Sequence, residues 1–237
     1  MATGSERRPF GTTLTQTQVD EGLRSYMLRV YNYMGSGLAL TGIVAYVVAH
    51  TGLYQALFSS GIGFVVMFAP LGIIFFMGSK IKTMKPSTAQ TLFWVFSILI
   101  GASLSYVFLA YTATSVVRVF FITAGTFGAM SLYGYTTKRS LARWGSFLFM
   151  GLIGVIIAMV VNIFMQSSVL HFVVSVAGVL VFTGLTAYDT QRIKQSYVES
   201  DGKDVMTKKA IMGAISLYLN FLNLFMMLLM LFGGGRD

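Results

Sequence analysis

The chain has 237 residues, of which 55% are hydrophobic and 11% charged, and its mean hydropathy is +0.73. These values are too apolar for a water-soluble domain of this size and indicate an integral membrane protein. The net charge of +9 comes from basic residues that lie between apolar stretches, so it does not predict a nucleic-acid partner. The chain contains no cysteine, which excludes disulfide bonds and thiolate metal sites.

Three segments follow from this pattern along the chain. Residues 1–25 form a polar tail, residues 26–233 a transmembrane domain, and residues 234–237 a short C-terminal end. The tail is charged and lacks the short apolar core of a cleavable signal peptide, so we interpret it as retained in the protein. A polar segment of this kind is not expected to fold alone.

Seven apolar stretches are long enough to cross about 30 Å of hydrocarbon at about 1.5 Å of helix rise per residue. In chain order they span residues 30–49, 60–78, 90–111, 116–135, 144–165, 169–190 and 210–232. Pro70 lies inside the second stretch, where it is expected to kink the helix and to free a carbonyl near mid-membrane; lining a cavity is one use of such a carbonyl, and an ordinary kink is the alternative. We therefore predict an all-α membrane protein with seven transmembrane helices.

The basic residues predict the orientation of these helices. If the N-terminus is cytoplasmic, 15 of the 17 lysines and arginines fall on the cytoplasmic side, and Arg118 and Arg236 remain outside. Cytoplasmic loops are enriched in lysine and arginine in membrane proteins. We expect a cytoplasmic N-terminus and a C-terminus on the outside.

Asp189, in the sixth stretch, is the one acidic residue inside a predicted span. A carboxylate in a membrane helix costs about 2.5–3.5 kcal/mol on insertion scales, so it usually has a partner or a function. Arg192 follows about 4.5 Å farther along the helix. An interfacial carboxylate that is paired with Arg192 and reached by water is therefore the structural alternative to a functional group.

A seam of small and polar residues runs along the seventh stretch at steps of three and four. Its members are Gly213, Ser216, Asn220, Asn223 and Met227. This spacing places them on one helix face, which is expected to point inward. Asn220 lies about 15 Å along the helix from the start of the stretch, where an amide needs a partner. Structural hydrogen bonding between helices is the alternative interpretation.

The sequence gives little support for an enzyme. His50 and His171 lie at the ends of the first and sixth stretches, far from Asp189 along the membrane normal. The chain has no HExxH motif, no second membrane carboxylate for a di-aspartyl protease, and no lysine in the seventh stretch for a retinal Schiff base. We expect neither catalysis nor a bound cofactor.

Four stretches carry a family resemblance: residues 23–46, 127–154, 182–194 and 216–225, with "AYDTQRIK" and "LYLNFLNLF" the most specific parts. They resemble the bacterial branch of the Bax inhibitor-1 family, the transmembrane Bax inhibitor motif proteins. The resemblance implies a seven-helix bundle with the last helix at its centre, in the inner membrane of a bacterium. It also implies a pH-sensitive calcium leak and a link to stress tolerance or cell-death suppression.

The resemblance also assigns residues. In the family, two aspartates on the sixth and seventh helices form a proton-sharing pair that senses pH and gates the pathway. Asp189 matches the first, and Asn220 stands in the place of the second. An amide adds no charge and can donate a hydrogen bond, so the coupled titration of two carboxylates is lost. We expect flux to depend on Asp189 but to lose or acid-shift the family's pH response.

The family also uses a basic residue near the end of the second helix to latch the first aspartate. Lys80 and Lys82 are the candidates here, besides Arg192, and anchoring at the cytoplasmic interface is an equal alternative for both lysines. We expect a leak pathway for Ca²⁺ or another cation, with Asp189 on its cytoplasmic side. The alternative is a stress-response protein that binds and modulates a membrane partner, such as a membrane protease, without transport.

Overall fold

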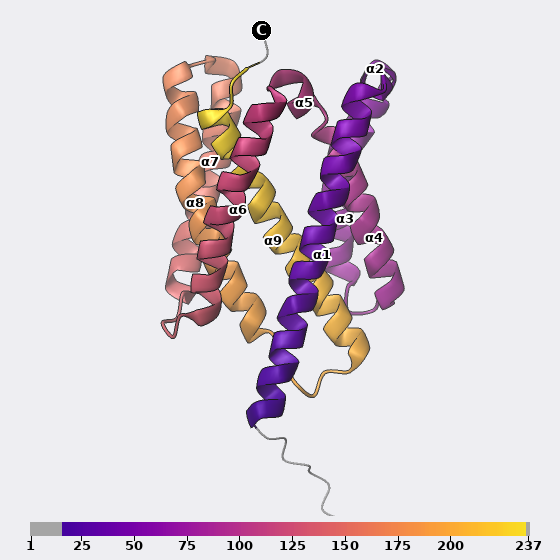
Figure 1. The fold of residues 1–237 in the computed structure, drawn as a ribbon, viewed down its shortest axis with the longest axis vertical. Coiled ribbons are helices and arrows are strands. Elements are labelled where there is room, and N and C mark those ends of the chain that lie inside the picture. The colour runs from indigo at the N-terminus through magenta and orange to yellow at the C-terminus, as the bar shows by residue number, and fades with distance from the viewer. Residues whose placement is uncertain (1–15, 236–237) are drawn as a thin grey trace, which may run out of the picture.

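The computed structural model describes residues 16–235, and these residues form a helical bundle (Figure 1). Its long helices are α1 (Gln16–His50), α3 (Ile62–Lys80), α4 (Pro86–Ser103), α6 (Ala113–Thr136), α7 (Ala142–Met165), α8 (Ser168–Gln195) and α9 (Lys203–Phe232). Two short helices, α2 (Leu53–Phe58) and α5 (Tyr106–Ala110), follow α1 and α4. Within the described residues, seven helical segments are long and apolar enough to cross a membrane, with α4 and α5 counted together. The predicted all-α fold with seven transmembrane helices is confirmed.

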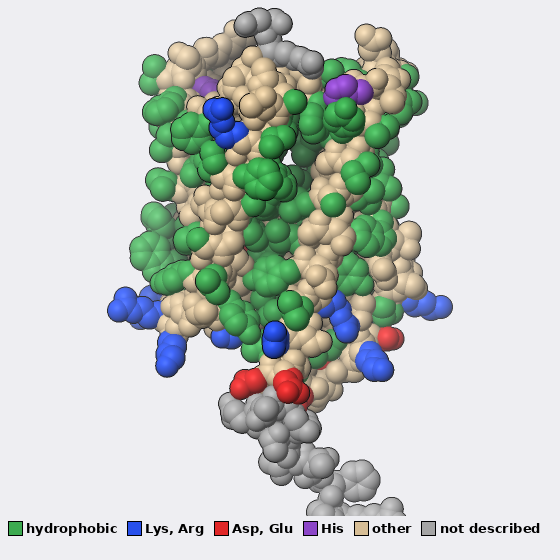
Figure 2. All heavy atoms as spheres, viewed as in Figure 1, with side chains coloured by type: hydrophobic (Ala, Val, Ile, Leu, Met, Phe, Trp, Pro, Cys, Tyr) green, Lys and Arg blue, Asp and Glu red, His purple; other side chains and the backbone are tan. Residues whose placement is uncertain are grey.

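Large apolar side chains cover the outside of the bundle (Figure 2). Phe64, Phe75, Phe121 and Phe164 each expose between 68% and 83% of their surface. A surface of this kind is unsuited to water, but it matches the hydrocarbon of a bilayer, where helices satisfy their own backbone hydrogen bonds. The chain is a multi-pass membrane protein.

The two ends of the bundle differ in charge. The α3–α4, α6–α7 and α8–α9 connections lie at the same end as the start of α1, and most basic side chains of the described residues gather there (Figures 1 and 2). We call this the basic end. Arg118, near the start of α6, lies toward the opposite end, where the described chain finishes. The placement of the basic end in the cytoplasm stays a prediction from the positive-inside rule.

Helix α9 forms the centre of the bundle. It packs against α8, α1, α6 and α4, whereas α3 packs mainly on α4, and α7 on α8. The most apolar stretch of α9 is 56% buried inside the bundle, whereas the corresponding stretches of the other six spans are 39% buried or less. Figure 1 shows α9 running diagonally, from the foot of α4 at the basic end toward α8 at the opposite end. The expected central position of the last helix is confirmed.

Several helices extend beyond the apolar stretches that predicted them. α1 begins at Gln16, inside the segment expected as a polar tail, and residues 1–15 lie outside the described residues. α9 begins at Lys203 rather than near residue 210. Apolar length reports only the part of a helix within hydrocarbon, and the backbone hydrogen bonds continue into the polar first turns.

The C-terminal end of the described chain is held against the start of α6. The backbone carbonyl of Gly234 accepts a hydrogen bond from the backbone N–H of Thr112 at 3.2 Å.

Glycine allows α6 to approach α8 closely. A side-chain carbon at Gly134 would collide with the backbone of Ala187, so the two helices are in direct backbone contact there. Small residues permit such contacts between membrane helices. Because Ala187 lies two residues before Asp189, this contact fixes the part of α8 that carries the aspartate.

Pro70 frees a carbonyl that joins two helices. α3 continues from Ile62 to Lys80 with Pro70 inside it. Proline has no N–H, so the carbonyl of Val66, four residues earlier, loses its helical donor. Ser103 of α4 donates its hydroxyl to this carbonyl, with 3.0 Å between Oγ and O. The freed carbonyl expected from the sequence therefore binds α4 to α3 instead of lining a cavity.

We predict that Ser103→Ala lowers the free energy of unfolding by about 1 kcal/mol, because it leaves the Val66 carbonyl without a donor. Thermal unfolding in detergent measures this loss. In a Pro70→Ala background, the alanine N–H can satisfy Val66, and the same serine substitution should have almost no effect. Ser79→Ala, whose hydroxyl bonds to its own helix at Phe76, is the control. Equal losses in both backgrounds would contradict this role for Ser103.

Candidate functional site

The site lies where the last turns of α8 meet the middle of α9. Polar side chains are concentrated in this part of α8, and Thr186, Asp189, Thr190 and Gln191 are all buried there. Only 13% of the Asp189 side chain is exposed. Buried polar groups in a membrane protein need partners within the protein, because the surrounding hydrocarbon offers none.

Each oxygen of the Asp189 carboxylate has a partner. Asn220 of α9 lies 2.8 Å away, from its Nδ2 to Oδ2. Arg192, one turn farther along α8, contacts Oδ1 through Nη2 at 3.1 Å. An ionised carboxylate only accepts hydrogen bonds, so Asn220 must present its amide nitrogen. The carboxylate is therefore held by the central helix on one side and by a guanidinium toward the basic end on the other.

Arg192 connects α8 to α9 at the edge of the site. Its guanidinium donates to Oγ of Ser216 on α9 at 3.4 Å, and it lies 5.8 Å from the centre of the Tyr188 ring. Its side chain is 56% exposed, in contrast to the buried carboxylate that it pairs with. Because most of the guanidinium is in contact with solvent, water can replace the carboxylate as its partner, and its side of the ion pair is worth little, on the order of 0–1 kcal/mol, while the carboxylate keeps the Asn220 amide. The guanidinium can therefore leave the carboxylate at a small energetic cost.

The polar seam predicted on α9 faces α8. Its contacts, in order along α9, join Gly213 to Ile193, Ser216 to Arg192, Asn220 to Asp189, and Met227 to Gly178. Residue numbers rise along α9 as they fall along α8, as they must between antiparallel neighbours. Asn223 uses its amide within α9 instead, where it donates to the Leu219 carbonyl at 2.9 Å.

The three basic residues considered as latches occupy different places. Arg192 is the cation that pairs with Asp189 among the residues that the structure describes. Lys80 and Lys82 are exposed at the end of α3 and in the loop after it, and the backbone carbonyl of Lys82 accepts a hydrogen bond from Lys208 at 2.9 Å. The geometry thus brings Arg192 to the carboxylate and leaves the two lysines at the surface of the basic end.

A chain of hydroxyl groups beside the site was not predicted from the sequence. Tyr31 of α1 lies 2.6 Å from Ser131 of α6, which lies 3.0 Å from Thr190 of α8. Thr190 donates its proton to the Thr186 carbonyl at 2.8 Å. Ser131 must therefore donate to Thr190, and Tyr31 to Ser131. The chain joins three helices at the residue next to Asp189, and isolated hydroxyl residues in a sequence carry no signal of such a convergence.

Gln191 is a second group that the sequence did not reveal. Its Nε2 donates to the Arg139 carbonyl at 2.9 Å, and its Oε1 accepts from the Leu141 backbone at 2.8 Å. One side chain of α8 thus satisfies two backbone groups of the α6–α7 connection. This connection is fixed against the turn of α8 that carries Asp189.

The site offers one carboxylate to a cation. Within residues 16–235, no group of three or more histidine, cysteine, aspartate or glutamate side chains could hold a metal ion. A cation that bound Oδ1 of Asp189 would take the place that the Arg192 guanidinium occupies at 3.1 Å. One carboxylate, supplemented by neutral oxygens, binds Ca²⁺ weakly compared with a cluster of acids. Such an arrangement suits transient passage better than storage.

Comparisons with known proteins cover nearly the whole chain. The family described as "Inhibitor of apoptosis-promoting Bax1" matches residues 23–237. An uncharacterized protein of Rickettsia prowazekii is 51% identical, over 95% of this chain and 96% of its own length. An uncharacterized protein of Caulobacter vibrioides is 46% identical over 92% of each chain. The inner membrane protein YbhL of Escherichia coli K12 is 41% identical, over 98% of this chain and 100% of its own length.

We predict that Asn220→Leu lowers the free energy of unfolding by about 1–3 kcal/mol, because the buried carboxylate loses its donor from α9. Asn223→Leu is the matched control on the same helix, since that amide bonds only to its own backbone, and it should change stability little. In an Asp189→Asn background the loss caused by Asn220→Leu should shrink, because no charge is left unpaired. Denaturation in detergent measures these changes. Equal free energies of unfolding for the two leucine variants would contradict a stabilising bond between Asn220 and Asp189.

Proposed function

The chain belongs to the Bax inhibitor-1 family, and from this membership and the geometry at Asp189 we propose that it forms a cation leak pathway gated by that carboxylate. Ca²⁺ is the proposed permeant ion, as the family resemblance implies. The observation that carries the proposal is a buried carboxylate held between the Asn220 amide and the exposed Arg192 guanidinium. The inner membrane location of the relative YbhL supports the same location for this chain.

A structural role alone does not require a charge at this position. A neutral amide or hydroxyl could hydrogen-bond to Asn220 without the cost of placing a carboxylate among membrane helices. An intramembrane ionisable residue is therefore a functional group by default, and its most direct use here is to attract a cation. Asp189 lies six residues before the end of α8, which finishes at the basic end, and this end faces the cytoplasm under the positive-inside rule.

Arg192 acts as the latch in this proposal. While its guanidinium occupies Oδ1 of Asp189, a positive charge stands where a permeant cation would bind. Because the guanidinium is exposed, it can move into water and leave the carboxylate with one remaining partner, Asn220. Competition between Arg192 and the cation then sets how often the site is available, and a weak ion pair gives a leak and not a tightly closed channel.

Asn220 couples the carboxylate to the central helix without adding charge. The proton-sharing pair implied by the family resemblance needs a second carboxylate, and here an amide donates at 2.8 Å in its place. Arg192 is the charged group that faces Asp189, and Ser216 and Asn220 are the neutral groups from α9. No second carboxylate therefore shares a proton with Asp189, which removes the coupled titration that is the source of a steep pH response.

We predict that Arg192→Gln raises Ca²⁺ flux by about fivefold, because it removes a latch worth about 1 kcal/mol. Asp189→Asn should reduce the flux severalfold. Purified protein in liposomes that contain a calcium indicator measures both changes. Arg143→Gln, which removes an exposed arginine at the same end of the bundle, is the matched control and should behave like wild type.

The same liposomes separate transport from the alternative role. Deletion of residues 2–20 should leave the flux intact if the pathway lies in the helical bundle. A protein that modulates a membrane partner through its tail would lose that effect on deletion. No flux of any cation in the wild type, or full flux in Asp189→Asn, would overturn the pathway and favour the partner-binding role.

We predict that wild-type flux lacks a steep switch near neutral pH and that Asn220→Asp introduces one. In the variant, two carboxylates share one guanidinium, and they repel each other when both have lost their protons. Flux through the variant should therefore rise as the pH rises through the range in which the second proton leaves. Asn223→Asp is the control, since the amide of Asn223 bonds to the Leu219 carbonyl of its own helix and not to Asp189. A neutral-pH switch that is already present in wild type and unchanged in Asn220→Asp would contradict this view.

A further inference from the structure

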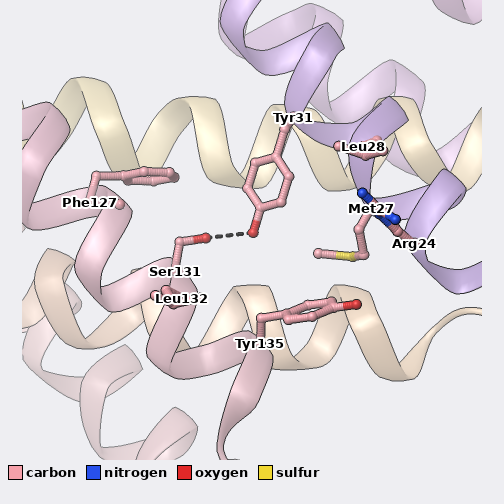
Figure 3. A pocket seen from close by; sticks show the side chains of 9 residues that line it. Arg24, Met27, Leu28, Tyr31, Phe127, Ser131, Leu132 and Tyr135 are labelled. Carbon is pink, nitrogen blue, oxygen red and sulfur yellow. Dashed lines mark hydrogen bonds between the residues drawn. The ribbon is translucent and has the colours of Figure 1, made fainter. Parts of the chain in front are cut away.

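A groove between α1 and α6 plays no part in the proposed pathway. The main contacts of α1 are with α4 and α9, and those of α6 are with α8 and α9, so the two helices flank α9 without packing closely on each other. Toward the basic end they enclose a cavity of about 580 Å³. Figure 3 shows its walls, with Met27 and Tyr31 of α1 opposite Ser131 and Tyr135 of α6. We call it the α1–α6 groove.

The lining of the α1–α6 groove is apolar and reaches the outer surface. Leu28 and Leu132 are exposed at its two rims, and Phe127 is buried at its inner side. Tyr31 and Ser131 bond to each other across it at 2.6 Å, so these two hydroxyls are already paired. A second cavity of about 100 Å³ lies between the same helices toward the opposite end, over Phe221 and Phe225 of α9. Figure 2 shows this face hollowed between the two helices and lined by hydrophobic side chains.

The mouth of the groove at the basic end is positively charged. Arg24 lines it on α1, about 10 Å of helix rise before Tyr31. A shallow hollow next to it is lined by Arg24 and Arg29 with one acid, Glu21. On the other flank, Nζ of Lys194 lies 4.8 Å from the centre of the Tyr135 ring. With the exposed Asp20, one turn before Arg24, counted beside Glu21, three cations face two carboxylates, so the mouth keeps a net positive charge beside an apolar channel.

We propose that the α1–α6 groove binds an anionic phospholipid. Its phosphate lies at Arg24, where basic side chains near the membrane surface attract anionic headgroups. One acyl chain follows the apolar lining past Tyr31 toward the second cavity. The charge of the mouth selects the headgroup, and the exposed apolar rims admit the chain from the surrounding bilayer. A zwitterionic lipid matches the channel but not the mouth, and free phosphate matches the mouth but not the channel.

Binding is tested on the purified full-length chain in detergent, by native mass spectrometry with added lipid. Phosphatidylglycerol should bind more tightly than phosphatidylcholine of the same chain length, and inorganic phosphate should not displace it. Arg24→Gln should weaken the binding of phosphatidylglycerol by about fivefold, because one basic residue near the membrane surface contributes about that factor in affinity. Arg143→Gln is the control at the same end of the bundle and should have no effect. Equal binding of the two lipids, or equal weakening by both variants, would overturn the proposal.

A second pair of variants tests the channel. Gly128 lines the α1–α6 groove, and a Cβ atom added there meets nothing within 4 Å, so the side chain of Gly128→Leu starts in open space and occupies part of the groove. Gly154 of α7 has the same open surroundings away from the groove, and Gly154→Leu carries the same gain in helix propensity. Gly128→Leu should remove the preference for phosphatidylglycerol, and Gly154→Leu should keep it. An unchanged preference in Gly128→Leu would overturn the site, and neither result depends on ion flux.

Discussion

The carboxylate of Asp189 must find its partners inside the protein, because the hydrocarbon around the bundle cannot solvate it. This constraint organises the fold around it. A partner from another helix requires α9 to turn its polar seam toward α8, and Asn220 is the member of the seam that reaches the carboxylate. A helix that carries such a seam cannot face lipid, so α9 lies at the centre and is covered by α1, α4, α6 and α8. The close contact of Gly134 with Ala187 then holds the last turns of α8 in place.

The same constraint explains polar contacts far from the site. Pro70 leaves a carbonyl without a donor in the middle of α3, and Ser103 of the neighbouring helix supplies one. Thr41 of α1 lies 2.6 Å from the Tyr218 hydroxyl of α9, so a phenol at the centre of the bundle is also paired across helices. In water these groups would be solvated at little cost, whereas the hydrocarbon of a bilayer offers an unpaired group no replacement partner. The polar residues of this chain therefore specify which helices are neighbours, while its apolar residues specify only that they are helices in a membrane.

This division decides what the sequence can predict. Apolar length predicted the seven spans, and steps of three and four predicted the polar seam on the last of them. The carboxylate could also be placed within a span, because all of these are local properties of one helix. The meeting of Asp189 with Asn220 could not be derived in this way. Measured along straight helices, Asp189 lies near the basic edge of its apolar stretch, about 4.5 Å from Arg192. Asn220 lies about 15 Å from the start of the seventh apolar stretch. Figure 1 shows that α9 runs diagonally across the bundle, and the amide of Asn220 meets Asp189 at 2.8 Å. The tilt of a membrane helix is set by packing against its neighbours, not by its own sequence.

The pairing of Asp189 with Arg192 is the contact that the interfacial alternative also requires, so it does not by itself separate a gate from an anchor. The amide of Asn220 is more informative. A carboxylate that merely sits at the interface would turn both oxygens toward water and the guanidinium, whereas here one oxygen points to a buried amide on the central helix. The two partners then differ in mobility, since one is buried and fixed and the other is exposed and able to leave. Asp189 can therefore exchange its partner only on the side of Arg192, where a cation can replace the guanidinium, while Asn220 stays bound on the other side. This asymmetry is what a latch requires.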